Sequence, residues 1–198
     1  MNYAFEEKFV FTKNPENLVF LDIETTGLDP EKGAKIIEIA MLKTKDGLDQ
    51  KYESFVNPCC SIPEDCSKVN FIYDDMVKEA PSFKDIAKDI ISFIEDEIVV
   101  CHNASFDLLF VSKELSQAGI ISKKFFYLDT LQLARQYFNF ESNKLASIAN
   151  AIGVEVALSH RAMADVFTMK AVAKYLFANM YRKGIGIIQP LSYQYRQT

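Results

Sequence analysis

The spacing of hydrophobic residues changes along this chain, and the changes predict an alternation of strands and helices. Apolar residues run almost continuously through 19–23, which is typical of a buried strand. Two further strand-like runs follow at 35–42 and 50–56, with Asp46 and Gly47 as a turn between them. We expect these three strands to form an antiparallel meander.

From Pro81 onward the hydrophobic period becomes helical. Apolar residues at three- and four-residue steps predict an amphipathic helix over 83–94, which leads into a short apolar strand at 97–101. Because a strand–helix–strand connection forms a crossover, this strand should lie parallel to the first one. Further along, the pattern predicts helices at 104–118, 130–138 (capped by Asp129 or Thr130), 145–152 and 162–182, and a strand at 125–128.

Together these elements predict a single α/β domain. Its mixed five-stranded sheet would consist of a three-stranded antiparallel meander plus two parallel strands, flanked by helices. We expect the domain to cover residues 17–183, with an N-terminal lead-in at 1–16 and a C-terminal tail at 184–198. Residues 57–79 show no clear period and are expected to form loop or short helix.

The composition narrows the class of protein. The chain has 198 residues, 49% hydrophobic and 25% charged, as in a soluble globular domain with a substantial core. No apolar run could span a bilayer, and acids stand where a signal peptide would be basic, so we expect no membrane association and a cytoplasmic location. The four cysteines match no zinc spacing and should be reduced. The net charge of −5 argues against a protein that grips long duplex DNA.

Two carboxylates interrupt the first apolar strand. Asp22 and Glu24 are two residues apart, so both side chains should face the same side of the strand, with Cα atoms about 7 Å apart. Unpaired carboxylates inside an apolar strand are costly, and a shared divalent cation would remove that cost. The alternative is a pair of acids at a solvated strand end.

Two aspartates fall on otherwise apolar helical faces, each near one of the two histidines of the chain. Asp107 lies in the first turn of the helix that follows His102 and Asn103, where its structural role would be to complement the helix dipole. Asp165 lies in the first turn of the last helix, five residues after His160, and needs a partner or a cation there. A single histidine is more often structural than catalytic, but the repeated pairing favours a catalytic role for His160.

The electrostatics of four converging acids favour a metal site over a structural cluster. Two unit charges about 4 Å apart repel by roughly 4 kcal/mol at an effective dielectric near 20, and the sequence shows no matched arginines nearby. Divalent cations would reverse most of this repulsion. Because the ligands would all be hard oxygens, magnesium or manganese is expected.

Three motifs carry a resemblance to a known family. DIETTGL at 22–28, HNASFD at 102–107 and HRAMAD at 160–165 are similar to the three exonuclease motifs of the DnaQ-like (DEDDh) family of 3′–5′ exonucleases. That family includes the epsilon proofreading subunit and exonuclease domains of bacterial replicative polymerases, RNase T and oligoribonuclease. The resemblance spans about residues 17–180 and implies a ribonuclease H-like fold.

The resemblance also implies a role for each motif residue. Asp22, Glu24 and Asp165 would hold one of two divalent cations, Mg²⁺ or Mn²⁺, and Asp22 with Asp107 would hold the second. His160 would be the general base that deprotonates the attacking water, a task that suits a histidine. Binding of the terminal nucleotide is implied for Thr25, Thr26, Gly27, Leu28, His102, Asn103 and Phe106.

For Asn103 and Phe106, helix capping and core packing are the alternative roles. The implied activity is metal-dependent 3′–5′ hydrolysis of single-stranded nucleic acid ends. The substrate would be DNA in a proofreading or repair enzyme, and RNA in the alternative of an RNase T or oligoribonuclease type. A rival from another class is a non-catalytic module that binds nucleic-acid ends or a polymerase.

A DNA polymerase or a sliding clamp is the implied protein partner. The tail segment 189–193, QPLSY, resembles a clamp-binding peptide, and an ordinary disordered end is the alternative interpretation. The sequence indicates no oligomeric state.

Overall fold

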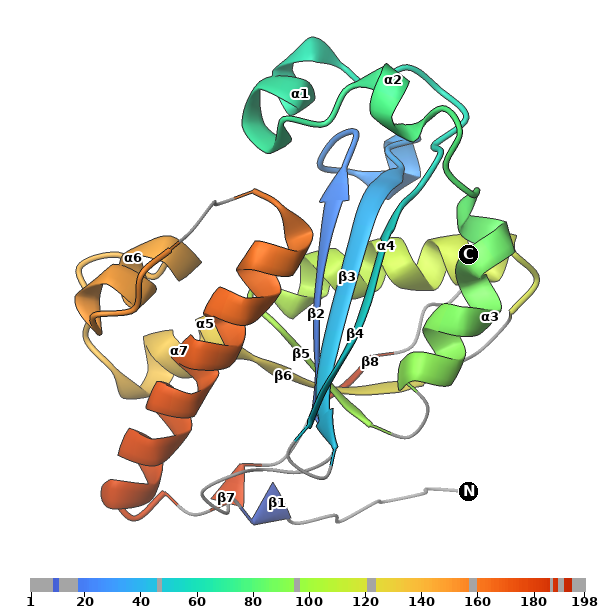
Figure 1. Cartoon of the computed structure of the whole chain (residues 1–198). Helices are drawn as coiled ribbons and strands as arrows, with labels where there is room; N and C mark the ends of the chain where they lie inside the picture. Colours follow the sequence, from blue (N-terminus) through green and yellow to red (C-terminus); the bar gives the residue numbers. More distant parts are fainter. Residues whose placement is uncertain are drawn as a thin grey trace.

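The structure, a computed structural model, is built around a mixed sheet of six strands (Figure 1). It describes residues 9–10, 18–45, 48–94, 97–120, 124–156, 160–185, 187–188 and 191–193. From one edge of the sheet to the other, the strands are β4 (Leu48–Phe55), β3 (Ile36–Lys45), β2 (Leu18–Thr25), β5 (Ile98–Cys101), β6 (Phe125–Asp129) and β8 (Leu191–Tyr193).

The strand directions confirm the predicted meander and crossover. β2 pairs antiparallel with β3, which places Asp22 opposite Ala40 and Glu24 opposite Glu38, and β3 pairs antiparallel with β4. β5 lies parallel to both β2 and β6, as a crossover connection requires. The turn predicted at residues 46 and 47 lies outside the described residues.

The sixth strand comes from the predicted tail. β8 pairs antiparallel with β6, so the interpretation of 189–193 as a disordered end is wrong for residues 191–193. Three residues are too few for a period-two pattern to reveal a strand. In addition, β1 (Phe9–Val10) from the lead-in pairs with β7 (Ile187–Ile188) from the tail, so segments from the two ends of the chain lie side by side (Figure 1). The division into lead-in, domain and tail stays a prediction.

Helices cover both faces of the sheet (Figure 1), and the alternation of side chains along β2 decides which helices each residue meets. Leu18 and Phe20 belong to the core under α5, α6 and α7, whereas Val19 and Leu21 belong to the core under α3 and α4. All five helices agree with the predicted ranges to within a residue or so at each end: α3 (Phe83–Ile94), α4 (Ala104–Gln117), α5 (Thr130–Tyr137), α6 (Leu145–Ala151) and α7 (Ala162–Arg182).

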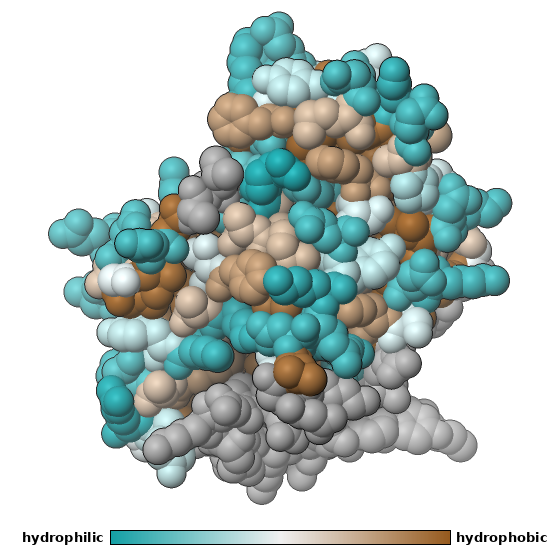
Figure 2. Space-filling view, in the orientation of Figure 1, coloured by the Kyte–Doolittle hydropathy of each residue, from teal (hydrophilic) through white to brown (hydrophobic). Residues whose placement is uncertain are grey.

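Between β4 and α3 the chain forms two short helices, α1 (Glu64–Asn70) and α2 (Asp74–Val77), in the region predicted as loop or short helix. They lie together at one end of the sheet (Figure 1). Figure 2 shows an apolar band at this end of the molecule. The exposed apolar side chains of this segment are Val69, Phe71, Tyr73 and Met76.

Two expectations drawn from composition can be compared with the structure. No helix in the described part of the chain is long and apolar enough to cross a membrane. The four cysteines are unpaired, and Cys101 is buried in β5.

Asp129, at the carboxyl end of β6, fixes the starts of two helices. Its Oδ1 accepts hydrogen bonds from the backbone amides of Leu131 at 2.9 Å and Asn103 at 3.0 Å. Its Oδ2 accepts from the amide of Ala104 at 3.1 Å. The side chain is 5% exposed, so these bonds are shielded from water. Because α4 carries Asp107 in its first turn, Asp129 helps to set the position of that aspartate.

Replacing Asp129 by alanine should destabilise the fold. Losing a helix cap costs roughly 0.5–2 kcal/mol, and the buried amides of α4 lose their acceptor as well, so the free energy of unfolding should fall by about 2–4 kcal/mol. Urea denaturation at pH 7 measures the change. The matched control is Asp29→Ala, because Asp29 caps the short 3-10 helix η1 (Pro30–Lys32) through one exposed bond and should cost about 1 kcal/mol or less. Equal losses in the two variants would contradict the role given to Asp129.

Candidate active site

The second half of β2 carries two of the predicted acids on one face. Asp22 and Glu24 continue the alternation of Leu18 and Phe20, which belong to the core beneath α7. Both carboxylates therefore point toward the side of the sheet that α7 covers, as their spacing predicts. Both positions are paired with β3, Asp22 opposite Ala40 and Glu24 opposite Glu38, which fixes their backbone on that side.

The beginning of α7 brings Asp165 and His160 to the same place. The Oδ2 atom of Asp165 accepts a hydrogen bond from the backbone amide of His160 at 2.8 Å. His160 has a φ of 65°, in the left-handed region that non-glycine residues seldom occupy. One potential ligand atom from each of Glu24, His160 and Asp165 lies within 4.8 Å of the others. Residues from β2 and α7 thus form one cluster.

The fourth predicted acid reaches the cluster from α4. Asp107 is 4% exposed, and burial raises the pKa of its carboxyl well above the ordinary value. Burial also raises the pKa of Asp22, and the nearby charges of Asp107, Asp165 and Glu24 raise it further. These mutual effects show that acids from β2, α4 and α7 share one region.

The pKa of Glu24 shows that ionised carboxylates are disfavoured in this region. Burial is the largest cause that raises its pKa to about 8, followed by the charges of Asp165 and Glu38, while the cation of Arg161 lowers it. The pKa of Asp165 is raised by burial as well, although the hydrogen bond from the amide of His160 opposes the rise. The acids therefore resist full ionisation at neutral pH unless a cation joins them.

Sequence reasoning missed a fifth carboxylate, Glu38 on β3, together with its partner Arg161. The Glu38 side chain is almost fully buried, and its Oε1 accepts a hydrogen bond from Nη2 of Arg161 at 2.9 Å. Its Oε2 accepts from the backbone amide of Ala162, the first residue of α7, at 3.0 Å. The expectation that no matched arginine lies near the acids is therefore wrong.

Two features of the sequence could have drawn attention to this pair. Glu38 interrupts the apolar run KIIEIAML just as the acids interrupt β2, and Arg161 directly follows His160. The partners are separated by 123 residues, however, so no local pattern links them.

A cavity of about 560 Å³ opens beside the acids. Asp22, His160 and Asp165 contribute to its lining. The rest comes from His102, directly after β5, and from α5, the segment between α5 and α6, and the start of α6. The lining residues are Asp22, His102, Leu131, Arg135, Asn143, Lys144, Leu145, Ala146, His160 and Asp165.

His102 lies in the wall of this cavity with both ring nitrogens engaged. Nε2 donates to the carbonyl oxygen of Asn143 at 2.9 Å, and Nδ1 lies 2.9 Å from Oγ1 of Thr130. Burial lowers the pKa of His102, so the neutral ring is favoured. The hydroxyl of Thr130 itself donates to the carbonyl of Cys101 at 3.1 Å. A ring held in this way can support the segment that contains Asn143, but it has no free nitrogen for proton transfer.

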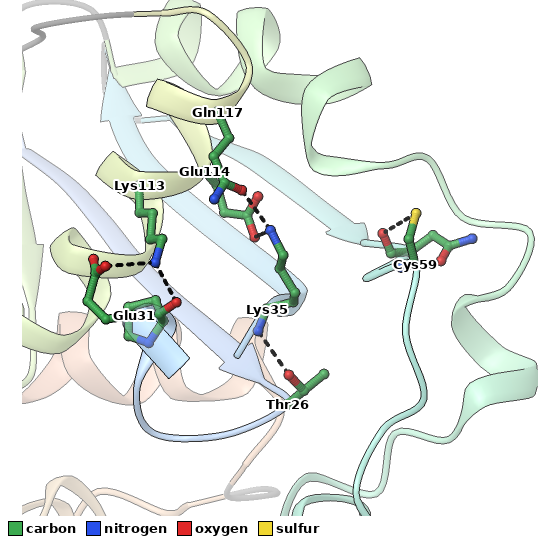
Figure 3. A network of polar contacts seen from close by, with 9 residues as sticks. Thr26, Glu31, Lys35, Cys59, Lys113, Glu114 and Gln117 are labelled. Atoms are coloured by element: carbon green, nitrogen blue, oxygen red, sulfur yellow. Dashed lines mark hydrogen bonds and ion pairs between the residues drawn. The ribbon is translucent and has the colours of Figure 1, made fainter. Parts of the chain in front are cut away.

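The turn after β2 contains four of the residues predicted to hold a nucleotide. The Thr25 hydroxyl donates to the carbonyl of Gly27 at 2.6 Å, which closes the turn. Thr26 is buried, and its Oγ1 accepts from the amide of Lys35 at 2.9 Å (Figure 3). Leu28 is 86% exposed, so this apolar side chain is available for contact with a ligand.

Lysines anchor this turn and the segment after it to α4 (Figure 3). The Nζ atom of Lys35 lies 3.2 Å from Glu114 and donates to Gln117 at 2.7 Å. The Nζ atom of Lys113 donates to the carbonyl of Pro30 at 2.6 Å. The turn is therefore fastened to the same helix that carries Asp107.

Asn103 and Phe106 lie at the start of α4. Asn103 is exposed, with a φ of 81°, and it precedes the first residue of the helix. Phe106 is half-buried, and its ring centroid lies 5.0 Å from that of Phe110. Packing of Phe106 is thus observed, and contact of either residue with a nucleotide stays a prediction.

Comparison with known proteins identifies the family to which this fold and this acid cluster belong. The family model of the exonuclease family (RNase_T) matches residues 19–173, and the chain belongs to this family. The chain is 37% identical over 183 residues to a PolC-type DNA polymerase III of Staphylococcus saprophyticus. The alignment covers 91% of this chain and 12% of the polymerase. The chain thus spans a small part of the length of that relative.

Two further comparisons agree with the family. The chain is 32% identical over 168 residues to the epsilon subunit of DNA polymerase III of Buchnera aphidicola, which covers 79% of this chain and 72% of the subunit. The structure of Escherichia coli exonuclease I in complex with a dT13 oligonucleotide matches with a TM-score of 0.72 and 17% identity, covering 86% of this chain and 43% of that one. At this identity, the match shows a shared fold.

Exonucleases of this family generally use divalent metal ions. The residues of the cluster fit such an ion, because they offer several carboxylate oxygens and the hard cations Mg²⁺ and Mn²⁺ prefer oxygen ligands. The raised pKa values of the acids also favour a bound cation, because a cation would stabilise the ionised carboxylates that burial disfavours.

The stability of the metal-free protein should fall as the pH rises. The pKa of Glu24 is raised from the ordinary value of 4.5 to about 8, so the folded state binds this proton more tightly than the unfolded chain. That stabilisation is present below about 4.5 and is lost as the pH rises toward about 8. The raised pKa values of Asp22 and Asp165 act in the same direction.

Thermal unfolding in EDTA between pH 5.5 and 8.5 measures this dependence, and we expect Tm to decrease across the window. Excess Mg²⁺ should flatten the curve, because the cation binds the ionised carboxylates. The matched variant Glu24→Gln should reduce the slope in EDTA, while the raised pKa values of Asp22 and Asp165 leave part of it. A Tm that increases with pH in EDTA would show that the acids do not interact as described.

Proposed function

We propose that the protein is a metal-dependent 3′–5′ exonuclease that hydrolyses the terminal phosphodiester bonds of single-stranded DNA. The observation that carries the proposal is the meeting of Glu24, Asp165 and the exposed His160 within 4.8 Å, near the half-buried Asp22 and the buried Asp107. Four carboxylates and one imidazole in one place fit phosphodiester hydrolysis better than a structural role, because nothing in a purely structural site requires repelling acids.

The acids would act as metal ligands. Asp22, Glu24 and Asp165 would hold one divalent cation, and Asp22 with Asp107 would hold a second. When bound, the two cations would supply Lewis-acid stabilisation of the attacking and leaving oxygens during an in-line displacement at phosphorus.

His160 would be the general base. Its amide is held by Asp165, so the imidazole is attached to a fixed backbone although the side chain is exposed. The ring would accept a proton from the attacking water while the new P–O bond forms and the bond from phosphorus to the upstream 3′ oxygen breaks. The terminal nucleotide then leaves as a 5′-monophosphate. The left-handed backbone of His160 supports this role, since such strain is often stored at functional sites.

The turn after β2 would hold the terminal nucleotide, with the exposed Leu28 against its base. The names of the polymerase relatives favour DNA over RNA as the substrate. A DNA polymerase or sliding clamp as partner, and the cytoplasmic location, stay predictions.

A digestion assay tests the proposed function. Single-stranded DNA and RNA oligonucleotides, each labelled at the 5′ end, are incubated with the protein with and without Mg²⁺, and the products are sized. We expect a ladder that shortens from the 3′ end with DNA, only when Mg²⁺ is present. A 3′-labelled oligonucleotide should release labelled mononucleotide at once. Absence of digestion of both nucleic acids would favour the rival interpretation, a module that binds ends without cleaving them.

Asp22→Ala should abolish this activity and leave the domain folded. Asp22 would contribute to both cations, so its loss removes ligands that no other residue replaces. Rates on a labelled oligonucleotide measure the effect, and circular dichroism checks the fold. Asp89→Ala is the matched control, because Asp89 is exposed on α3, which covers the opposite face of the sheet, and it should keep the full rate. An Asp22→Ala protein with the normal rate would exclude the proposed mechanism.

His160→Ala should slow the reaction by roughly 10²–10⁴-fold, the usual range for loss of a general base. The Mg²⁺ concentration that gives half-maximal rate should stay within a few-fold of the original, because the imidazole would move a proton and not hold the metal. Initial rates over a series of Mg²⁺ concentrations measure both quantities. If the metal requirement rises in step with the loss of rate, His160 is a metal ligand instead.

A further inference from the structure

The cavity beside the acids has a cationic wall that the proposed function leaves without a role. Arg135 on α5 and Lys144 at the start of α6 line the cavity together with Asn143, and we refer to these three residues as the α5–α6 wall. The wall faces the same space as Asp22 and Asp165. A cavity with acids in one part and cations in another fits a ligand that carries more than one phosphate.

Both cations of the wall are available to a ligand. Within the described part of the chain, neither Arg135 nor Lys144 forms an ion pair or a side-chain hydrogen bond. Other basic residues near the site are engaged: Arg161 with Glu38, and Lys113 with the carbonyl of Pro30. In a chain with a net charge of −5, two uncommitted cations beside an acid cluster are suited to a phosphate.

The position of the wall is fixed by hydrogen bonds. His102, directly after β5, donates to the carbonyl of Asn143 and lies in hydrogen-bond contact with Thr130, so the segment between α5 and α6 is held against the sheet. In addition, Oδ1 of Asn143 is buried and receives no hydrogen bond from the described residues. An unpaired buried amide oxygen is costly, which favours a rotation of this side chain toward a donor on a ligand.

The position of the cavity also indicates which part of a bound DNA strand the α5–α6 wall would contact. A phosphodiester at the acids has two arms, the terminal nucleoside on one side and the upstream strand on the other. The turn at 25–28 directly follows Glu24, and Asn103 and Phe106 lie within four residues before Asp107, but none of these residues lines the cavity. If that turn holds the terminal nucleoside, the cavity lies on the side of the acids where the upstream part of the DNA strand would be. Its volume of about 560 Å³ is within the usual range of ligand sites.

We propose that the α5–α6 wall binds the next phosphate upstream of the bond that is cleaved, with Arg135 and Lys144 as its cationic contacts and Asn143 as a hydrogen-bonding partner of the penultimate nucleotide. This inference rests on the proposed function. It makes a strand with at least two phosphates the preferred substrate, and it makes the wall a determinant of KM and not of kcat. Arg135 and Lys144 take no part in the chemical step.

The test compares two substrates in Arg135→Ala and Lys144→Ala. One is a single-stranded DNA decamer. The other is thymidine 5′-(p-nitrophenyl phosphate), in which p-nitrophenol replaces the upstream strand and no second phosphate is present. We expect KM for the decamer to rise about tenfold in each variant with kcat within twofold, since a charge-assisted contact to phosphate is lost. Kinetics on the nitrophenyl ester should stay within twofold of the original.

Three further measurements sharpen the comparison. The slope of log KM for the decamer against log salt concentration should decrease by about 0.7 in each variant, as expected for one lost phosphate contact on a single strand. Arg135→Lys keeps the charge and should restore KM to within about threefold. The matched controls Lys88→Ala on α3 and Arg182→Ala at the end of α7 remove exposed charges that do not line the cavity, and they should leave KM unchanged.

Unchanged KM values for the decamer in both wall variants would overturn the inference. So would an equal rise of KM for the nitrophenyl ester, because the wall would then bind the terminal nucleotide. If the original protein hydrolyses neither substrate, the proposed function fails separately. Fluorescence anisotropy with a labelled decamer and Ca²⁺ then decides the inference alone: weaker binding in the wall variants, with a reduced salt slope, supports it, and unchanged binding refutes it.

Discussion

Repulsion among buried carboxylates is the constraint on which the arrangement of the site depends. At an effective dielectric near 20, two unit charges about 4 Å apart repel by roughly 4 kcal/mol. The pKa of Asp22 is raised by burial and, in addition, by the charges of Asp107, Asp165 and Glu24. Such a cluster keeps its geometry because each acid is attached to a rigid element. β2 lies in the middle of the sheet, α4 is anchored by Asp129, and the first residue of α7 is bound by Glu38.

The protein offsets only part of this repulsion. Asp107 and Asp165 lie in the first turns of α4 and α7, where the partial positive charge of a helix end is worth roughly 0.3–1 kcal/mol, and up to about 2 in partly buried sites. That gain is smaller than one close carboxylate repulsion. The nearby cation, Arg161, is hydrogen-bonded to Glu38 and so brings little net charge to the other acids. The balance therefore favours binding of a divalent cation, which can neutralise several carboxylates at once.

Local sequence patterns predict most of the fold, because burial imposes a period of two on strands and 3.6 on helices. The same alternation predicts that Asp22 and Glu24 share a face of β2. The pattern fails where tertiary contacts decide: β8 has three residues, too few for a period, and its place beside β6 depends on a partner more than 60 residues away. Pairing of Glu38 with Arg161 is hidden for the same reason, although an acid inside the apolar run of β3 was a visible anomaly.

The Glu38–Arg161 pair contributes more to positioning the start of α7 than to the stability of the fold. A buried ion pair gains little net free energy, because desolvation offsets most of the attraction. Glu38, however, lies opposite Glu24 in the register of β2 and β3, and its carboxylate also accepts from the amide of Ala162. The strand pairing that positions Glu24 therefore also positions the start of α7, with His160 and Asp165 on either side of that amide in the sequence. Glu24 therefore meets His160 and Asp165, which come from a distant part of the chain, because one strand register and one buried carboxylate set the separation of β2 and α7.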